Sequence, residues 1–361
     1  MRRTAIAALV LSTACPVTGC SLLSDSSSDS SPSSPSADLE EALDVVPDTA
    51  TSVTYVGRAA AAERLEIDDV ETGADEEDVD RYLEGLRESM AATTTLTDYL
   101  PQMQEAAFSD LDLEWEVSAQ GDDGMWVVWR IDDDVDLDEV ADDMVAAGYE
   151  ETEEDGGRHL RSSLGAASSD GRRYPVEVMM SPVLVPDEHL IIVSPDPEAV
   201  LEVITDDGDS VLDAEDLDEV VDAADDAEFA HLRRDIDCGA VYEDGPLSPE
   251  ETEQLNAASG LEDLGRPDAT GFFVHGDDAG TTTTVLAFAD DDAAKADATA
   301  REAWLEGEPL LASGGPFTQD ATWDVETDGP LVRIDHDYGT GDASTASSLA
   351  FDGDGFALCA P

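Results

Sequence analysis

Two periods of apolar residues recur along the chain after residue 37, and each period predicts a different kind of element. Alternation of apolar and polar residues, rich in Val, Ile and Thr, predicts strands, whereas apolar residues spaced three or four apart predict helices. Alternation is clear at residues 51–56, 113–119 and 125–131, and further strands are predicted at residues 159–163, 176–180, 189–194, 271–275, 282–289, 322–327, 331–336 and 356–358. Helices are predicted at residues 58–65, 76–90, 96–108, 137–147, 195–204, 214–224 and 293–305, and residues 37–44 are either a short helix or a continuation of the segment before them.

Adjacent strands with short turns between them predict β-hairpins. Residues 113–119 and 125–131 form one such pair, and a helix follows that Asp136 caps and that ends at Gly148. Hairpin, helix and hairpin recur loosely from residue 271 onward. We therefore expect an α+β fold, with antiparallel sheets built from β-hairpins and helices packed on one face.

The length of the chain predicts two folded domains behind a leader and a tether. The predicted segments are a signal peptide (1–19), a lipidated cysteine with a Ser-rich tether (20–37), a first α+β domain (38–235) and a second α+β domain (236–361). Whether the two domains are similar halves stays open, because no strict sequence repeat relates them.

The start of the chain has the parts of an export signal. Arg2 and Arg3 precede a short apolar run that ends in small residues. This run is too short for a transmembrane helix, which needs about 20 apolar residues. The tetrad Val17-Thr18-Gly19-Cys20 that closes it resembles a lipobox. The resemblance implies that the signal is removed and that Cys20 becomes the diacylglyceryl site; the alternative is an ordinary cleaved signal with an incidental cysteine.

The residues after Cys20 are rich in Ser, Pro and Asp, which bury too little apolar surface to offset the entropy of folding. We expect a disordered tether there, which would let an anchored domain stand clear of lipid headgroups. The predicted location is the extracytoplasmic face of the cell membrane.

The mature part also resembles the uncharacterised lipoproteins of GC-rich Gram-positive bacteria. The likeness lies in stretches such as residues 183–193, Val-Leu-Val-Pro-Asp-Glu-His-Leu-Ile-Ile-Val, which a Pro-Asp-Pro helix start follows. It agrees with an envelope location and implies no activity.

The chain is strongly acidic, with 87 Asp and Glu against 17 Lys and Arg and a formal net charge of −70. Such a field repels nucleic acid, so we exclude nucleic-acid binding and expect a cationic or neutral envelope partner. The acidity has two candidate sources, a high-salt habitat and a GC-rich genome. Lys295 as the single lysine and Asn256 as the single asparagine favour codon bias as part of the cause.

Four cysteines are present, and their positions assign them different fates. Cys15 leaves with the signal peptide and Cys20 takes the lipid, which leaves Cys238 and Cys359. An even pair in an oxidising compartment predicts a disulfide bond.

The common catalytic motifs are missing from the sequence, including G-x-S-x-G, H-E-x-x-H, Gly-rich phosphate loops and EF-hand spacing. The histidines are single and scattered, so their spacing supports no zinc site. They are His159, His189, His231, His275 and His336. Carboxylate pairs cannot be singled out, because acidic residues this frequent bring pairs together in any fold. We therefore assign no catalytic residue.

Calcium is the one cofactor that the acidic loops suggest. Residues 132–139, 290–292 and 352–355 are rich in Asp, and hard oxygen ligands on such loops suit Ca²⁺. The competing interpretation is helix capping and solvated surface, since Asp is a preferred N-cap. We expect no cofactor and keep calcium as the alternative.

Three classes of function remain from the sequence. The first is a membrane-anchored, non-catalytic binding or envelope-interaction protein. The second is a lipid-anchored small-ligand or substrate-binding protein, although such proteins typically have parallel sheets. The third is a hydrolase with an unrecognised carboxylate site.

Overall fold

The structure is a computed structural model that describes part of the chain. The described residues are 35–86, 92–121, 124–154, 157–162, 173–205, 208–223, 227–236, 238, 263–275, 281–307, 322–337 and 359. The chain divides into two compact units, Met1–Ser33 and Ser34–Pro361, and the described residues all belong to the second.

Helices and strands are interspersed along this unit. The helices are α1 (Pro35–Asp44), α2 (Arg58–Arg64), α3 (Glu76–Leu86), α4 (Leu100–Met103), α5 (Leu137–Ala146), α6 (Glu198–Ile204), α7 (Glu215–Asp222) and α9 (Asp291–Glu306). The strands are β1 (Ala50–Gly57), β2 (Leu113–Gly121), β3 (Gly124–Ile131), β4 (Tyr149–Glu154), β5 (Gly157–Ser162), β6 (Pro182–Val185), β7 (Leu190–Val193), β8 (Ala227–Arg234), β9 (Ala269–His275), β10 (Thr281–Ala287), β11 (Thr322–Asp328) and β12 (Leu331–Asp337).

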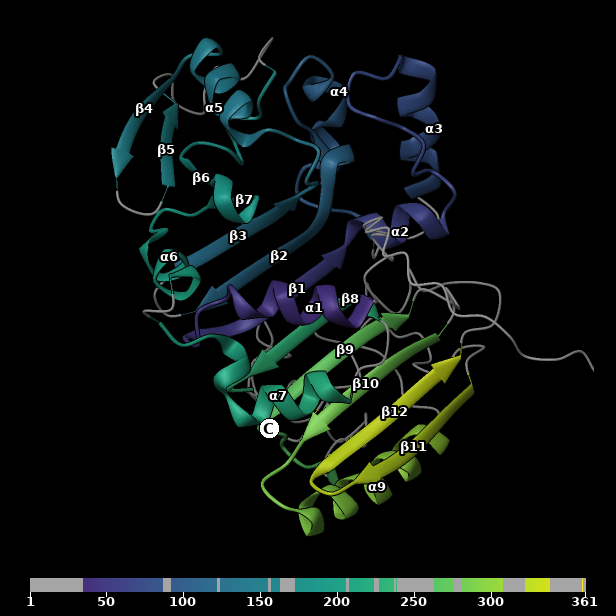
Figure 1. Ribbon diagram of the computed structural model, residues 1–361. Coiled ribbons are helices and arrows are strands. Elements are labelled where there is room, and N and C mark those ends of the chain that lie inside the picture. The colour runs from purple at the N-terminus through teal and green to yellow at the C-terminus, as the bar shows by residue number, and fades with distance from the viewer. Residues whose placement is uncertain are drawn as a thin grey trace, which may run out of the picture. The chain divides into compact units, whose positions relative to one another are not determined.

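All the strands in the described part of the chain join one antiparallel sheet of twelve (Figure 1). Their order is β11-β12-β10-β9-β8-β1-β2-β3-β7-β6-β5-β4. The α+β fold with an antiparallel sheet is therefore confirmed. The boundary predicted after residue 235 falls between β8 and β9, which are hydrogen-bonded neighbours, so the two predicted domains share this sheet.

Helices cover both faces of the sheet, because alternate residues of the central strands are apolar on both sides. Tyr55, Phe273 and Val285 lie on one face, here called the α1 face, and belong to a core cluster with residues of α1, α6 and α7. Phe272 and Leu286, each next to one of these in sequence, point the other way into a cluster with α9, and this side is the α9 face. At the far end of the α9 face, α5 packs on β3, β6 and β7. The second covered face is a difference from the expected one-sided packing.

Local sequence explains why most predicted elements form where they do. The Asp136 carboxylate accepts hydrogen bonds from the backbone N–H groups of Asp138 and Glu139 and starts α5. Gly148, with φ of 104°, ends it. The predicted hairpins β2–β3, β9–β10 and β11–β12 are all present.

Three unpredicted strands, one predicted strand and one predicted helix differ from the prediction. The pattern did not indicate β4, β6 and β8. The strand predicted at residues 176–180 is a turn, in which the Pro175 carbonyl accepts from the N–H groups of Val178 and Met179. The helix predicted at residues 96–108 is reduced to a 3-10 turn at Thr97–Tyr99 and the short α4. The edge strand predicted at residues 356–358 lies outside the described residues.

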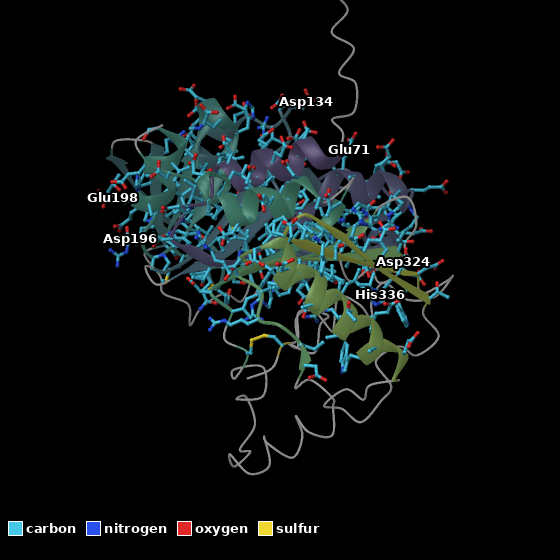
Figure 2. The ribbon with its side chains drawn as sticks, turned by 90° about the horizontal axis from the view of Figure 1, so that it is seen from below. Glu71, Asp134, Asp196, Glu198, Asp324 and His336 are labelled. Carbon is cyan, nitrogen blue, oxygen red and sulfur yellow. A yellow bond between two sulfur atoms is a disulfide. The ribbon has the colours of Figure 1, made fainter. Side chains whose placement is uncertain are left out.

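Acidic side chains lie on the outer surface of several elements, where Figure 2 shows Glu71, Asp134, Asp196 and Glu198 pointing outward. None of the helices in the described part of the chain combines the length and the apolar character that a membrane crossing requires.

Candidate functional site

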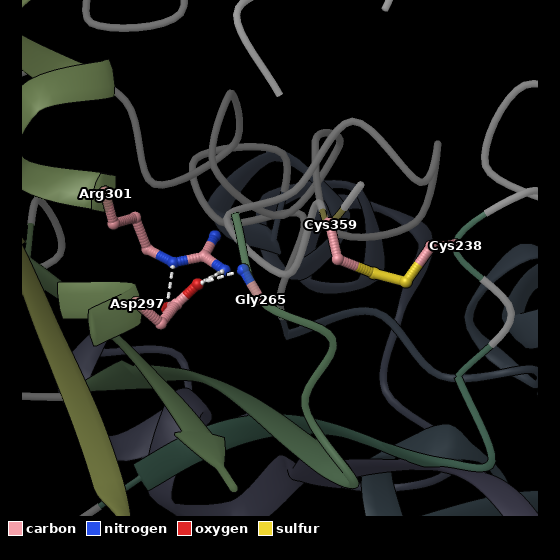
Figure 3. The surroundings of a disulfide bond; sticks show 5 residues. All are labelled: Cys238, Gly265, Asp297, Arg301 and Cys359. Carbon is pink, nitrogen blue, oxygen red and sulfur yellow. Dashed lines mark hydrogen bonds and ion pairs between the residues drawn. A yellow bond between two sulfur atoms is a disulfide. The ribbon is translucent and has the colours of Figure 1, made fainter. Parts of the chain in front are cut away.

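The two cysteines that the sequence predicts to pair are joined in the structure (Figure 3). Their Cα atoms are 5.4 Å apart, and both residues are buried beside Ile236. The bond spans 121 positions of the sequence and connects the end of β8 with the C-terminal tail. Cys20, the predicted lipid site, lies outside the described residues.

A buried ion pair on α9 appears in the same view as the disulfide (Figure 3). Arg301 donates to Asp297 from Nε at 2.8 Å and from Nη2 at 3.1 Å. Both side chains are essentially inaccessible. Asp297 also accepts from the backbone N–H of Gly265, 2.7 Å away. The pair thus fastens the segment before β9 to α9.

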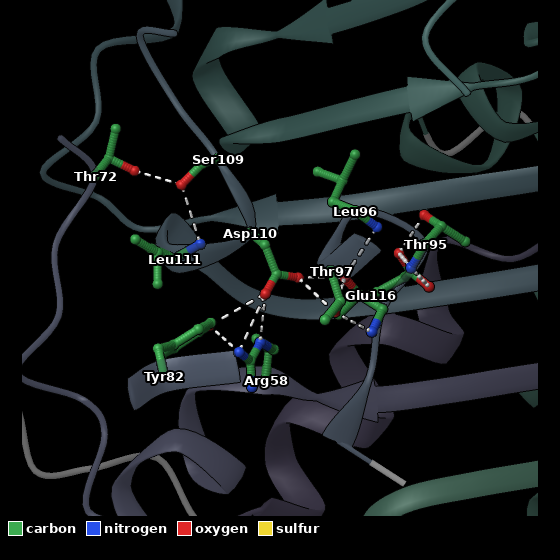
Figure 4. A network of polar contacts seen from close by, with 11 residues as sticks. Arg58, Thr72, Tyr82, Thr95, Leu96, Thr97, Ser109, Asp110, Leu111 and Glu116 are labelled. Carbon is green, nitrogen blue, oxygen red and sulfur yellow. Dashed lines mark hydrogen bonds and ion pairs between the residues drawn. The ribbon is translucent and has the colours of Figure 1, made fainter. Parts of the chain in front are cut away.

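A larger network of buried charges forms where β1 ends and β2 begins (Figure 4). Arg58 opens α2 directly after β1, and Asp110 lies in the turn directly before β2. Because β1 and β2 are antiparallel neighbours, with Gly57 paired to Trp115, the sheet brings these two ends together. Arg58 is 1% exposed and Asp110 is 0% exposed.

Five donor groups from separate segments converge on the Asp110 carboxylate. Arg58 donates to Oδ2 from Nε at 3.2 Å and from Nη2 at 3.1 Å, and the Tyr82 hydroxyl donates to it at 3.2 Å. The Thr94 and Thr97 hydroxyls donate to Oδ1, the latter at 3.1 Å. The guanidinium of Arg58 also contacts the Tyr82 hydroxyl and lies 4.6 Å from the centre of its ring. The network therefore holds α2, α3 and residues 94–97 against the sheet.

Glu116, in the first half of β2, is a second buried carboxylate near Asp110. It accepts from the backbone N–H of Thr95 at 2.9 Å, from the Thr95 hydroxyl at 2.7 Å and from Trp129 Nε1 at 2.6 Å. Burial raises the pKa of Glu116, and these hydrogen bonds oppose the rise. Burial lowers the pKa of Arg58, which the charge of Asp110 opposes.

The burial of this network limits the chemistry that its side chains could perform. Its three charged groups are all less than 5% exposed, so a substrate could reach them only if the segments around them moved. Nη1 of Arg58 is also buried and has no hydrogen-bond partner. The arrangement suits fixing the fold better than contacting a ligand.

No pattern in the sequence indicated this network. Asp110 and Glu116 are two of 87 acidic residues, and nothing in their neighbourhood distinguishes them. One available signal was Arg58, a scarce basic residue at the junction of a predicted strand and an Ala-rich helix.

The histidines remain dispersed in the structure, and no cluster suited to a metal ion occurs among the described residues. His231 Nδ1 lies 2.9 Å from the Thr54 hydroxyl, and burial lowers the pKa of His231 to about 4. His336 is buried in β12 on the α9 face, and burial lowers its pKa to about 3. His159 lies in β5, and His189 lies in the turn before β7.

One combination of hydroxyl, imidazole and carboxylate occurs on the α1 face. Thr283 Oγ1 lies 2.8 Å from His275 Nε2 and donates to Asp335 Oδ1 at 2.6 Å. A base that activates a nucleophile must lie between the hydroxyl and the carboxylate. Here the hydroxyl lies between the other two groups, so its hydrogen bond is already directed to the carboxylate.

The acidic loops considered for calcium make capping contacts where they are described. Asp136 caps α5, and Asp290 Oδ1 accepts from the N–H of Ala293 at the start of α9. Asp132 Oδ1 accepts from the N–H of Asp134. Residues 352–355 lie outside the described residues, so calcium there stays an untested alternative.

Two hollows border the described residues. An open one of about 740 Å³ lies along α3 and is lined by Asp75, Glu76, Glu77, Asp78, Asp80, Arg81 and Glu84. The other, lined by residues that include Val46, Trp126 and Val200, has no room for a water molecule. Neither has the apolar lining and ligand-sized volume of a typical small-molecule site.

Comparison with known proteins gives no family assignment. No protein-family model and no curated protein matches the chain. Among solved structures, TP0453 in crystal forms I, III and IV aligns with TM-scores of 0.39, 0.39 and 0.43 at 10%, 10% and 9% identity. The alignments cover 85% of this chain and 97%, 98% and 95% of those chains. Likeness at this level transfers no function.

Proposed function

We propose that this protein is a lipid-anchored extracytoplasmic binding protein, held to the membrane through Cys20, whose folded body contacts a partner in the cell envelope. The observation that carries the proposal is the tetrad Val17-Thr18-Gly19-Cys20 behind Arg2, Arg3 and a short apolar run. The partner is cationic or neutral, because the surface of the body is acidic.

The position of the folded body is compatible with such an anchor. Fourteen residues, 21–34, separate Cys20 from the start of α1 at Pro35. A chain of this length spans at most about 50 Å when extended. The domain would therefore work within that distance of the headgroups. The pairing of Cys238 with Cys359 also fits an oxidising compartment.

The described part of the chain favours binding over catalysis as the role of the body. The Arg58–Asp110 pair and Glu116 are enclosed and hydrogen-bonded, whereas the carboxylates that face solvent are distributed over many elements. Such a distribution gives long-range attraction for cations and no defined reaction centre.

The anchor is tested by fractionation of cells that make the natural chain or the Cys20→Ala variant. We expect the natural chain in the membrane fraction, with a diacylglyceryl thioether on Cys20 in the mass spectrum of its N-terminal peptide. The Cys20→Ala variant should lose both. Cys15→Ala is the matched control, since Cys15 lies in the predicted signal and should leave anchoring intact.

The binding role is tested by crosslinking in the same cells, followed by identification of the captured partners. A specific envelope partner that the Cys20→Ala variant fails to capture supports the proposal. Equal membrane retention of all three chains, or an unmodified Cys20, would overturn the anchor.

A further inference from the structure

Among the described strands, β11 forms one edge of the sheet. Its neighbour is β12, and the strand order ends at β11 on that side. An edge strand presents a row of backbone N–H and C=O groups that no neighbouring strand uses, and this row can pair with an added strand. With seven residues, β11 is long enough to receive one.

The two faces of β11 differ in chemistry. Trp323 and Val325 are half-buried and pack on the apolar cluster under α9. The alternate residues Asp324, Glu326 and Asp328 are exposed and point to the α1 face. A strand added here would extend an apolar row on one face and meet a row of carboxylates on the other.

These carboxylates are not neutralised within the described part of the chain. Asp324 lies directly opposite Asp335 of β12, and like charges in that position repel. Glu326 lies opposite Arg333, but the Arg333 guanidinium bonds to Asp335 and to the Ala223 carbonyl. Among the described residues, no ion pair involves Asp324, Glu326 or Asp328.

At the opposite edge of the sheet, β4, an arginine of the neighbouring strand contacts an edge carboxylate. Glu151 of β4 forms an ion pair of 2.6 Å with Arg158 of β5. Arg158 also contacts Asp138 and Asp142, so one guanidinium serves the carboxylates around this edge. The two edges therefore differ in that a guanidinium contacts Glu151 of β4, whereas the described ion pairs do not involve the exposed carboxylates of β11.

We propose that β11 binds an extended polypeptide segment of a partner by strand addition, and that in this segment Lys or Arg alternates with apolar residues. The basic side chains lie over Asp324 and Glu326, and the apolar side chains continue the row of Trp323 and Val325. Backbone hydrogen bonds supply affinity, and the alternation supplies specificity. This inference rests on the proposed function, for which it names the class of partner.

The test uses a synthetic peptide of about seven residues, the length of β11, in which lysine and valine alternate, and the purified full chain. The readout is hydrogen exchange of individual backbone amides. We expect the peptide to slow exchange in β11 by about tenfold or more and to leave β4 unchanged. A peptide of the same sequence with every backbone nitrogen methylated keeps the charge but cannot donate, and it should give no protection.

Two double variants test whether the carboxylates of β11 contribute to peptide binding. Asp324→Asn with Glu326→Gln should weaken peptide binding and reduce its dependence on salt. Glu150→Gln with Glu151→Gln removes the same charge from β4 and should leave binding unchanged. Equal binding of the methylated peptide, protection at β4 instead of β11, or equal loss in both double variants would each overturn the proposal.

The outcome is separable from that of the proposed function. Peptide binding by the purified chain does not depend on an anchor, whereas fractionation and crosslinking do not depend on β11. Failure of the peptide leaves the anchoring result intact, and failure of anchoring leaves the peptide result intact.

Discussion

Two regions of the molecule each bury an arginine–carboxylate pair, and they do so in different ways. Arg58 and Asp110 are 52 positions apart and come from separate elements. Arg301 and Asp297 are four positions apart on the same helix. Loss of the first pair should loosen the attachment of several segments to the sheet, whereas loss of the second should mainly release the contact between α9 and Gly265.

The polar groups around the two pairs differ as well. Around Asp110, hydroxyls of Tyr82, Thr94 and Thr97 donate to a carboxylate. On the α9 face, the hydroxyls of Thr282 and Thr284 are buried and have no hydrogen-bond partner. The hydroxyls of the first region are thus hydrogen-bonded, although Nη1 of Arg58 is not, whereas the two hydroxyls of the second carry an uncompensated cost of burial.

The largest expected effect comes from Asp110→Ala. It leaves the guanidinium of Arg58 buried without its counter-ion, and breaking a buried pair in this way costs about 3–5 kcal/mol of unfolding free energy. Urea unfolding followed by tryptophan fluorescence measures the loss.

Asp297→Ala is the matched variant in the other region. It removes three hydrogen bonds to a carboxylate, which join residues of one helix and a single loop contact, whereas Asp110 joins three separate segments to the sheet. We expect a smaller loss of about 1.5–3 kcal/mol. Equal losses in the two variants would contradict the distinction between a long-range and a local pair.

The next effect is a dependence on acid that His336 confers on the α9 face. Its pKa in the fold is about 3, against 6.5 for an unperturbed imidazole. As the pH falls below 6.5, the unfolded state takes up a proton that the folded state excludes, so stability falls until the pH reaches about 3. The loss over this window is about 4 kcal/mol.

His336→Leu checks this effect by difference. The free energy of unfolding of the variant should change less between pH 6.5 and pH 3 than that of the natural chain, whatever its value at neutral pH. Parallel pH profiles for the two chains would show that the imidazole is not held neutral by burial.

The smallest expected effect is a gain from Thr284→Val. The substitution replaces an unpartnered buried hydroxyl by a methyl group of similar size, which should raise the unfolding free energy by about 1 kcal/mol. Thr97→Val makes the same change where the hydroxyl donates to Asp110 and should lower stability instead. Thermal unfolding of the two variants compares the signs, and a loss in both would contradict the difference between the regions.

Elements with strong local patterns could be predicted from the sequence. The hairpin β2–β3 and the Asp136 cap of α5 depend on residues close together in the chain. The strand β8 (AEFAHLRR) could not, because its first four residues are all buried and no alternation marks it. Its place between β1 and β9 comes from long-range pairing.

The same distinction separates the residues of the sites. An even number of remaining cysteines and an expected oxidising compartment were enough to predict a bond between Cys238 and Cys359. The contact of Arg58 with Asp110 arises only when β1 and β2 pair, and no spacing in the sequence encodes it. Which of many carboxylates becomes buried is decided by the register of the sheet.

The central position of β1 has a consequence for how the chain folds. This first strand of the sequence becomes the sixth of the sheet, where Tyr55 pairs with Val117 of β2 on one side and with Ala230 of β8 on the other. Closing so long a loop precedes any gain from the second pairing, and folding rates fall as such non-local contacts increase. During synthesis, β1 therefore cannot pair with β8 until more than half of the chain has been made.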